Sequence, residues 1–205
     1  MTTIDIISDF VCPWCYIGKR HLDALRAEAD IETRWHPYLL HPEMPAGGID
    51  RAELVRAKFG SEERARELGR TVEAAACEAG LFIALGKAPR VPDTRDAHRL
   101  MRWATGQGVA DALAESLFAA YFVDGRDIGD AEVLADLGAN VGLDRAVVVK
   151  LLASDADREA VQAQADHARA IGVSGVPTMV FDRKLAVVGA QPVEALRTAV
   201  AQVAS

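Results

Sequence analysis

Apolar and polar positions divide the chain into two strand-containing ends and a long helical middle. Residues 2–8 are β-branched and apolar, which predicts a buried strand. Residues 16–29 carry apolar side chains at helical spacing, and residues 31–36 alternate between apolar and polar as a second strand would. Because a helix connects these two strands, we expect a right-handed crossover and a parallel pair.

The segment from residue 50 to residue 171 predicts a series of amphipathic helices. Residues 41–48 precede it, and their two prolines and two glycines interrupt regular structure. Side chains that favour helix N-caps stand before the apolar stripes. The predicted helix starts are Asp50, Ser61, Asp93 or Thr94, Asp130, Asp144 and a position near Asp155. Because each stripe must be buried against a neighbour, we expect a helical subdomain.

The last part of the chain returns to strands. Residues 172–175 predict a flexible turn, and residues 176–181 and 185–188 predict two strands joined by a tight turn. A final helix is expected to start at about Pro192. The predicted fold class is therefore α/β. Residues 1–48 and 172–205 would form one domain around a sheet, and residues 49–171 would form an inserted helical subdomain.

Composition and charge narrow the range of functions. With 205 residues, half of them hydrophobic, the chain is long enough to bury a large core. Its apolar runs are too short to cross a bilayer and its first residues do not resemble a secretory signal, so we expect a cytoplasmic protein without a membrane span. The net charge of −7 argues against nucleic acid as a partner, because binding phosphates requires a basic surface.

The candidate chemistry lies in Cys12, Pro13, Trp14 and Cys15, where the first strand meets the first helix. Pro13 suits the first helical position, since its missing N–H would have no partner there. Cys12 then falls at the N-cap, where free backbone N–H groups and the helix dipole stabilise a thiolate. Cys15 follows one helical turn later, close enough to form a disulfide with Cys12. The arrangement is typical of a redox-active pair.

A zinc site and a structural disulfide both account less well for the cysteine pair. A closed zinc site needs four ligands, and the third cysteine, Cys77, lies in a helical stretch without paired cysteines or histidines. We therefore expect no metal site, and we interpret Cys77 as a small buried hydrophobic residue. A purely structural disulfide across so short a loop would restrict the unfolded chain very little. In a reducing cytosol the pair would be mainly a dithiol.

The order of these elements resembles the thioredoxin superfamily, in particular its DsbA-type branch. The closest resemblance is to the FrnE-like oxidoreductases. It is carried by Ser-Asp-Phe-Val-Cys-Pro-Trp-Cys-Tyr-Ile-Gly-Lys at residues 8–19, Ala-His-Arg-Leu at 97–100, Ala-Tyr-Phe at 120–122, Gly-Arg-Asp-Ile at 125–128 and Gly-Val-Ser-Gly-Val-Pro-Thr at 172–178. The resemblance implies a thioredoxin-like fold with a large inserted helical subdomain, as in DsbA.

The resemblance also implies the catalytic residues. Cys12 would be the attacking thiol, Cys15 the resolving thiol, and Pro177 a cis-proline that faces them. Pro13, Trp14 and Val176 are the expected substrate-binding residues. Trp14 would also tune the thiols, and the backbone at residue 176 would pair with an extended substrate as an added strand.

Histidines and one aspartate near the motif leave alternatives open. None of the histidines lies between the two cysteines, so we expect all of them to be structural or surface residues, with His98 of the Ala-His-Arg-Leu segment as the one to reconsider. They are His21, His36, His41, His98 and His167. Asp9 could accept or relay a proton near the site, or it could be an ordinary turn residue at a strand end.

The leading prediction is a thiol–disulfide oxidoreductase that needs no bound cofactor and uses glutathione or another thiol as redox co-substrate. Its substrate would be a protein or small-molecule disulfide or thiol. The alternative, which the same resemblance implies, is a glutathione-dependent isomerase or kappa-class-like transferase. Those proteins generally carry serine at the position of Cys12. A redox-inactive interaction module would have no use for the pair. The sequence leaves open the direction of exchange and whether the protein is a monomer or a homodimer.

Overall fold

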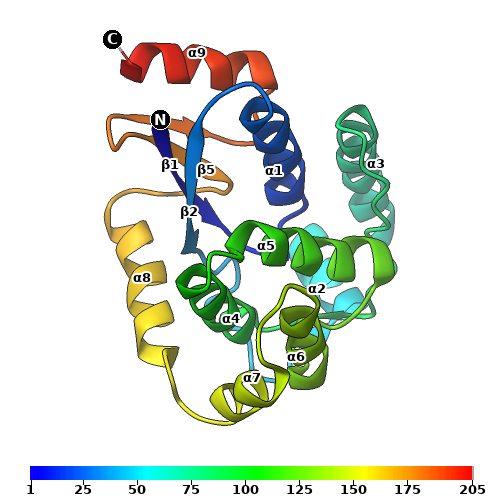
Figure 1. Cartoon of the computed structure of the whole chain (residues 1–205). Coiled ribbons are helices and arrows are strands. Elements are labelled where there is room, and N and C mark those ends of the chain that lie inside the picture. The colour runs from blue at the N-terminus through cyan, green and yellow to red at the C-terminus, as the bar shows by residue number, and fades with distance from the viewer. Residues whose placement is uncertain (205) are drawn as a thin grey trace.

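A four-stranded sheet built from both ends of the chain lies at the centre of the fold (Figure 1). The structure is a computed structural model that describes residues 1–204. The strands stand in the order β2-β1-β5-β6. They are β1 (Thr2–Ser8), β2 (Ile31–Pro37), β5 (Thr178–Phe181) and β6 (Leu185–Val188). β1 is parallel to β2 and β5 is antiparallel to β6, which confirms the two predicted pairings. β5 is also antiparallel to β1, a pairing that the sequence did not predict.

Two helices come from the same two terminal segments of the chain as the sheet strands. α1 (Pro13–Arg26) connects β1 to β2 and starts three residues earlier than the apolar spacing alone suggested. α9 (Val193–Ala204) follows the hairpin and contacts α1 at one end of the molecule (Figure 1). The hairpin turns at Asp182 and Arg183, whose φ angles of 45° and 57° suit a tight two-residue turn.

The helical middle of the chain covers the carboxyl end of β1 and β2 (Figure 1). Its helices are α2 (Arg51–Phe59), α3 (Glu62–Glu78), α4 (Arg95–Gly106), α5 (Ala110–Ala119), α6 (Ala131–Asn140), α7 (Arg145–Leu152) and α8 (Arg158–Ala170). A π-helical turn, η1 (Ala120–Asp124), extends α5. A short pair that the sequence did not predict, β3 (Ile49–Asp50) with β4 (Arg90–Val91), is antiparallel.

The predicted caps define most of these helices. Asp50, Asp130 and Asp144 each accept backbone N–H groups from the first turn of the following helix. Each such cap is worth about 1 kcal/mol. For α4, where two caps were open, the carboxylate of Asp93 accepts the N–H of Arg95 at 3.1 Å. The last helix of this region begins at residue 158, a few residues after the position expected from the sequence.

The helical middle shares one hydrophobic core with the start of α1, whereas the buried residues of β1 and β5 belong to separate clusters. Phe10 and Tyr16, which flank the two cysteines, lie in the same buried cluster as Phe118 and Phe122. The ring of Phe118 lies 5.0 Å from that of Phe10 and 5.1 Å from that of Tyr16, centroid to centroid. Aromatic pairs at this distance add about 0.5–1.5 kcal/mol beyond the area they bury. The helical middle therefore packs directly against the motif, and the division at residues 49 and 171 stays a prediction.

Arg99 holds α4 against the end of α7. Its side chain is fully buried, and its guanidinium donates to the carbonyl oxygens of Leu151, Leu152, Ser154 and Ala156. The guanidinium also pairs with the carboxylate of Asp96 at 2.7 Å. These carbonyls lie in and just after the last turn of α7, where helix carbonyls lose their regular intrahelical partners. The buried charge is therefore fully satisfied.

The prediction for Cys77 was wrong. Cys77 is exposed on α3, whereas the preceding residue, Ala76, is buried. Successive residues in a helix point about 100° apart, so an alanine-rich stretch gives little indication of which residue faces inward. Within residues 1–204, no helix combines the length and the apolar character that crossing a membrane requires.

Candidate active site

The strand-to-helix junction presents Cys12 and Cys15 in the predicted manner. Cys12 is the N-cap of α1, with extended backbone angles (φ −94°, ψ 112°), and Pro13 occupies the first turn. The carbonyl of Cys12 accepts the N–H of Cys15 at 3.0 Å, and the carbonyl of Asp9 accepts the N–H of Cys12 at 3.1 Å. These bonds fold the four-residue motif into one compact turn. The two cysteines approach each other to 3.6 Å.

The two thiols have opposite pKa shifts. A hydrogen bond from the Cys15 thiol, together with backbone N–H groups at the helix start, lowers the pKa of Cys12 although burial opposes this. Burial, followed by the neighbouring Cys12 sulfur, raises the pKa of Cys15 well above its usual range. Cys12 therefore becomes a thiolate first, and a thiolate is the nucleophilic form of cysteine.

The turn before β5 lies against Cys12. The peptide bond between Val176 and Pro177 is cis, the isomer that the family resemblance implied. The Cys12 thiol donates to the carbonyl oxygen of Val176 at 3.5 Å. Thr178 supports the turn, since its hydroxyl donates to the carbonyl of Gly175 at 2.7 Å. Residues separated by most of the chain thus meet at one sulfur atom.

Gly18 of α1 lies close to the ring of Pro177. A Cβ atom at this position of α1 would lie only 2.9 Å from Pro177 Cγ. Real Cβ contacts are not this short, so glycine allows the helix to approach the proline ring closely. Gly18 belongs to the family-like segment at residues 8–19, but the sequence alone assigns it no role.

Pro13 and Trp14 lie between the cysteines at the helix start. Trp14 is 37% exposed, although the two cysteines on either side of the Pro13-Trp14 pair are buried. Pro13 is half-buried. Both can be reached by a molecule that approaches Cys12, but no contact in the structure assigns them a role in binding, and that role stays a prediction.

Asp9 and His98 meet beneath the motif. Asp9 is 1% exposed and His98 is 4% exposed. The Asp9 carboxylate accepts the backbone N–H of Leu40 at 2.7 Å, and its other oxygen faces His98 Nε2 at 3.6 Å. The His98 ring packs against Phe10, with 5.0 Å between centroids. His98 is thus a buried residue close to the motif, and Asp9 is more than an exposed turn residue.

A second polar group near the motif could not be found by sequence reasoning. Glu115 of α5 accepts the Tyr16 hydroxyl at 2.8 Å and pairs with Lys19 and Arg20 at 2.8 and 2.9 Å. Lys19, which is almost fully buried, also pairs with Asp23. Burial and the carboxylate of Glu115 raise the pKa of the Tyr16 hydroxyl, which therefore stays protonated. The group joins α1 to the helical middle immediately after Cys15.

Among residues 1–204 there is no group of three or more His, Cys, Asp or Glu side chains arranged to hold a metal ion. Two of the histidines away from the motif have other partners. His36 contacts the Asp5 carboxylate, and His21 Nδ1 lies 2.8 Å from the Gln191 carbonyl.

Together, the sheet order, the helix that follows β1, the dithiol at its start and the cis-proline opposite define a thioredoxin-fold thiol protein. Over residues 3–201 the sequence matches the DSBA-like thioredoxin domain. The chain belongs to this family, which confirms the predicted fold class and the resemblance.

Solved structures agree with this assignment. A protein of Streptomyces coelicolor described as a "probable DsbA oxidoreductase" is 31% identical, with a TM-score of 0.89 over 98% of this chain and 89% of its own. The cytosolic disulfide reductase DsbM of Pseudomonas aeruginosa, solved with glutathione, is 20% identical, with a TM-score of 0.71 over 99% and 100%. A 2-hydroxychromene-2-carboxylate isomerase is also 20% identical, with a TM-score of 0.77 over 98% and 96%. The last two establish similarity of fold.

Proposed function

We propose that this protein is a thiol–disulfide oxidoreductase in which Cys12 and Cys15 alternate between dithiol and disulfide. The observation that carries the proposal is the inequality of the two thiols. The pKa of Cys12 is lowered and the pKa of the adjacent Cys15 is raised. Cys12 therefore supplies the thiolate that attacks first, and Cys15 stays protonated until the second step. Membership of the DSBA-like family supports the same chemistry.

The exchange takes place in two displacements. The Cys12 thiolate attacks one sulfur of a substrate disulfide, forms a mixed disulfide and releases the other substrate sulfur as a thiolate. Cys15 then loses its proton and attacks the Cys12 sulfur, so the Cys12–Cys15 bond forms and the second substrate sulfur leaves. The substrate is reduced and the enzyme pair is oxidised. The reverse sequence oxidises a substrate dithiol.

Pro177 and Val176 would guide the substrate to Cys12. The Val176 carbonyl lies 3.5 Å from Cys12 Sγ, so a peptide that pairs with the backbone at this residue would bring its sulfur to the nucleophile. Pro177 follows directly on that carbonyl and is a catalytic residue in this proposal, because its ring would adjoin the reacting sulfur. The exposed Trp14 and the half-buried Pro13 would contact the substrate on the other side.

The proposed chemistry also indicates the substrate, the co-substrate and the effect of a reducing cytoplasm. The substrate is a protein or small-molecule disulfide or thiol, and glutathione or another thiol restores the pair without any bound cofactor. The glutathione in the DsbM structure supports the choice of a thiol co-substrate. A reducing cytoplasm would keep the pair as a dithiol and favour reduction of substrates.

Cysteine substitutions test the proposal. With glutathione or dithiothreitol as donor, the wild type should reduce the disulfides of insulin, and Cys12→Ser should lose this activity. Cys15→Ser should instead accumulate a mixed disulfide, visible by non-reducing electrophoresis and mass spectrometry. Cys77→Ser is the matched control, since this exposed thiol lies outside the pair and its loss should leave the rate unchanged. Retained insulin reduction by Cys12→Ser would exclude Cys12 as the nucleophile.

A second candidate is glutathione-dependent isomerisation, which the similarity in fold to the 2-hydroxychromene-2-carboxylate isomerase supports. In that case the wild type should isomerise the chromene substrate with glutathione and leave disulfides untouched. Cys12→Ser should keep or gain this activity, because the hydroxyl would replace the thiol that activates glutathione. The cysteine at position 12 and the second cysteine beside it favour exchange over isomerisation.

A further inference from the structure

One hydroxyl interrupts the apolar face that the sheet presents to α1. In β1, Ile4 and Ile6 lie in one buried cluster with Leu22 and Leu25 of α1. Side chains two residues apart in a strand share a face, so Ser8 continues the face of Ile4 and Ile6 toward the cysteine motif. Ser8 is 1% exposed. A polar side chain so deeply buried in an apolar face calls for a reason.

The geometry of α1 places Cys15 over Ser8. Cys15 precedes Leu22 by seven residues, which is about two helical turns, so both side chains lie on the side of α1 that faces the sheet. The side chains that meet Ile4 and Ile6 come from the later turns of α1. The first turn, which carries Cys15, therefore lies over the end of β1, where Ser8 is.

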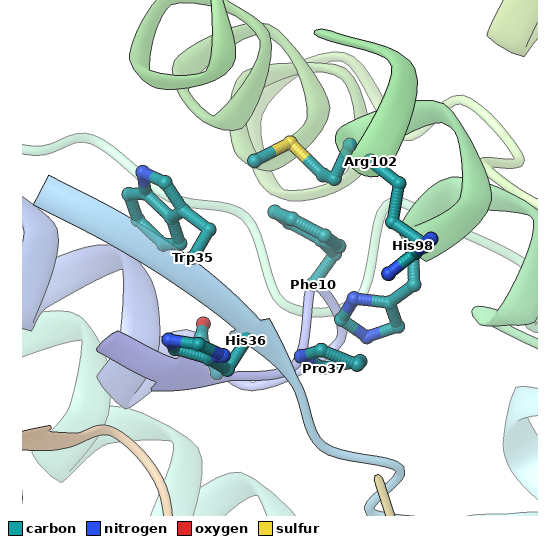
Figure 2. Close-up of a pocket in the computed structure, with 8 residues that line it drawn as sticks. Phe10, Trp35, His36, Pro37, His98 and Arg102 are labelled. Carbon is teal, nitrogen blue, oxygen red and sulfur yellow. The ribbon is translucent and has the colours of Figure 1, made fainter. Parts of the chain in front are cut away.

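The Ser8 hydroxyl has no hydrogen-bond partner among the described residues while both cysteines are thiols. Ser8 lines a small pocket together with Phe10, Trp35 and Pro37 (Figure 2). No polar atom of these walls lies within hydrogen-bond distance of Ser8 Oγ. The pocket has space for a group as small as water or methyl. The hydroxyl is therefore free to turn toward a new acceptor.

Two donors face the Cys15 sulfur. The Ser8 hydroxyl and the backbone N–H of Asp9 both favour the Cys15 thiolate, and they oppose part of the rise in its pKa that burial causes. Fixed donors stabilise a transition state when they are aimed at the atom on which negative charge develops. Because the hydroxyl is unpaired beside the neutral thiol, its stabilising effect arises only when this charge forms. An interaction of this kind accelerates the step.

We propose that Ser8 is a further catalytic residue, whose hydroxyl donates to the Cys15 sulfur as negative charge forms there in the second displacement. The Asp9 N–H is the second donor to the same sulfur. The inference rests on the proposed function, because Cys15 carries this charge only if it resolves a mixed disulfide.

The step balances with hydroxide from the solvent as the base. Cys15 gives its proton to hydroxide, which becomes water, and keeps the electron pair as a thiolate to which Ser8 donates. This pair forms the bond from Cys15 to Cys12, while the bond between Cys12 and the substrate breaks. The substrate sulfur leaves as a thiolate with the electrons of the broken bond. The enzyme pair is oxidised, the substrate is reduced, and Ser8 keeps its proton.

The test separates the two displacements in time. Dithiobis(nitrobenzoate) releases one coloured thiolate when Cys12 attacks and a second when Cys15 resolves the mixed disulfide, and stopped-flow absorbance follows both. All proteins carry Cys77→Ser so that the exposed third thiol stays silent. Ser8→Ala removes the donor, whereas Ser8→Thr keeps a hydroxyl and adds a methyl group for which the pocket has space. Met101→Leu, in the wall of the same pocket, is the matched control for packing.

We expect Ser8→Ala to lower the thiolate population of Cys15 by about 10–100-fold, the effect of one hydrogen bond to a charged group. A thiolate of higher pKa is the stronger nucleophile, so the second release should slow by only about 3–10-fold near neutral pH. This difference should shrink as the pH rises toward the pKa of Cys15. The first release should keep its rate. Ser8→Thr should recover most of the second rate, and Met101→Leu should keep it.

Stability gives a second readout. The reduced Ser8→Ala protein should unfold at the same urea concentration as the reference or at a higher one, because the hydroxyl has no partner to lose. All variants retain the other titratable or charged groups around the pair and the pocket, which are Cys12, Asp9, His36, His98 and Arg102.

A second release at the reference rate in Ser8→Ala would overturn the role of Ser8 and leave the oxidoreductase intact. Slowing of equal size at every pH, or equal slowing in Met101→Leu, would also overturn it, since both indicate altered packing. The same holds for a Ser8→Thr protein that is as stable as the reference but as slow as Ser8→Ala. A lower urea midpoint in Ser8→Ala would show that the hydroxyl is structural. A reference protein that releases only one thiolate would instead refute the proposed function.

Discussion

Replacing Gly18 with alanine would push a methyl group into the ring of Pro177. The new Cβ would lie 2.9 Å from Pro177 Cγ and 3.5 Å from Met179 Cε. Carbon atoms prefer separations of about 3.5–4.0 Å, so the first contact is too short and the second is ordinary. Either the proline ring or α1 must move by several tenths of an ångström.

Two effects of opposite sign decide the stability of Gly18→Ala. Alanine in a helix interior is about 1 kcal/mol more favourable than glycine. Extra volume in a well-packed core costs about 1–3 kcal/mol. We therefore expect a loss of about 0–2 kcal/mol in the free energy of unfolding. The exchange rate should fall as well, since the displaced ring adjoins Val176, whose carbonyl contacts the Cys12 thiol.

Gly69→Ala is the matched control for this prediction. Gly69 lies inside α3, and a Cβ there would meet only Leu85 Cδ1, at an ordinary 3.5 Å. This variant should gain about 1 kcal/mol and keep its activity. Urea unfolding and insulin reduction measure both quantities. If Gly18→Ala gained as much stability as Gly69→Ala and reduced insulin at the wild-type rate, the close contact of α1 with Pro177 would limit neither stability nor activity.

Three further predictions concern single side chains. Alkylation of the reduced protein at mildly acidic pH should label Cys12 first, because its pKa is lowered, and peptide mapping that finds Cys77 or Cys15 labelled first would contradict this. Arg99→Met should lower the free energy of unfolding by about 3 kcal/mol or more, since several carbonyls and the Asp96 carboxylate lose the buried guanidinium that donates to them; a urea midpoint within error of the wild type would argue against it. The reduced protein should lose stability as the pH rises above about 8.5, where Cys15 ionises only when unfolded, and Cys15→Ala should lessen this loss in urea titrations.

Local signals in the sequence were sufficient for most of the fold. The side chains of Asp50, Asp130 and Asp144 mark helix starts because a cap depends only on the next few residues. The turn at Asp182 and Arg183 follows from its position between two short apolar runs. The same reasoning placed Cys12 at the N-cap, so the location of the motif could be predicted before the structure.

Features that depend on distant contacts could not be predicted in this way. β3 and β4 pair with each other but contain only two residues each, which is too short for a recognisable strand pattern in the sequence. The contact between Asp9 and His98 exists only because α4 packs across the end of β1, and Gly18 gains its role only from Pro177. The resemblance at residues 97–100 was the one hint that His98 had a special position.

The inequality of the two thiols links the helical middle of the chain to the chemistry of the sheet. Cys12 and Cys15 have the same side chain and lie one helical turn apart. Cys12 lies at the helix start, beside free backbone N–H groups, whereas Cys15 is buried more deeply in the core. That core is closed by Phe118 of α5, which packs on Phe10 and Tyr16 on either side of the motif. Burial is the largest cause of the raised pKa of Cys15, so the helices that provide it help to set which thiol ionises first.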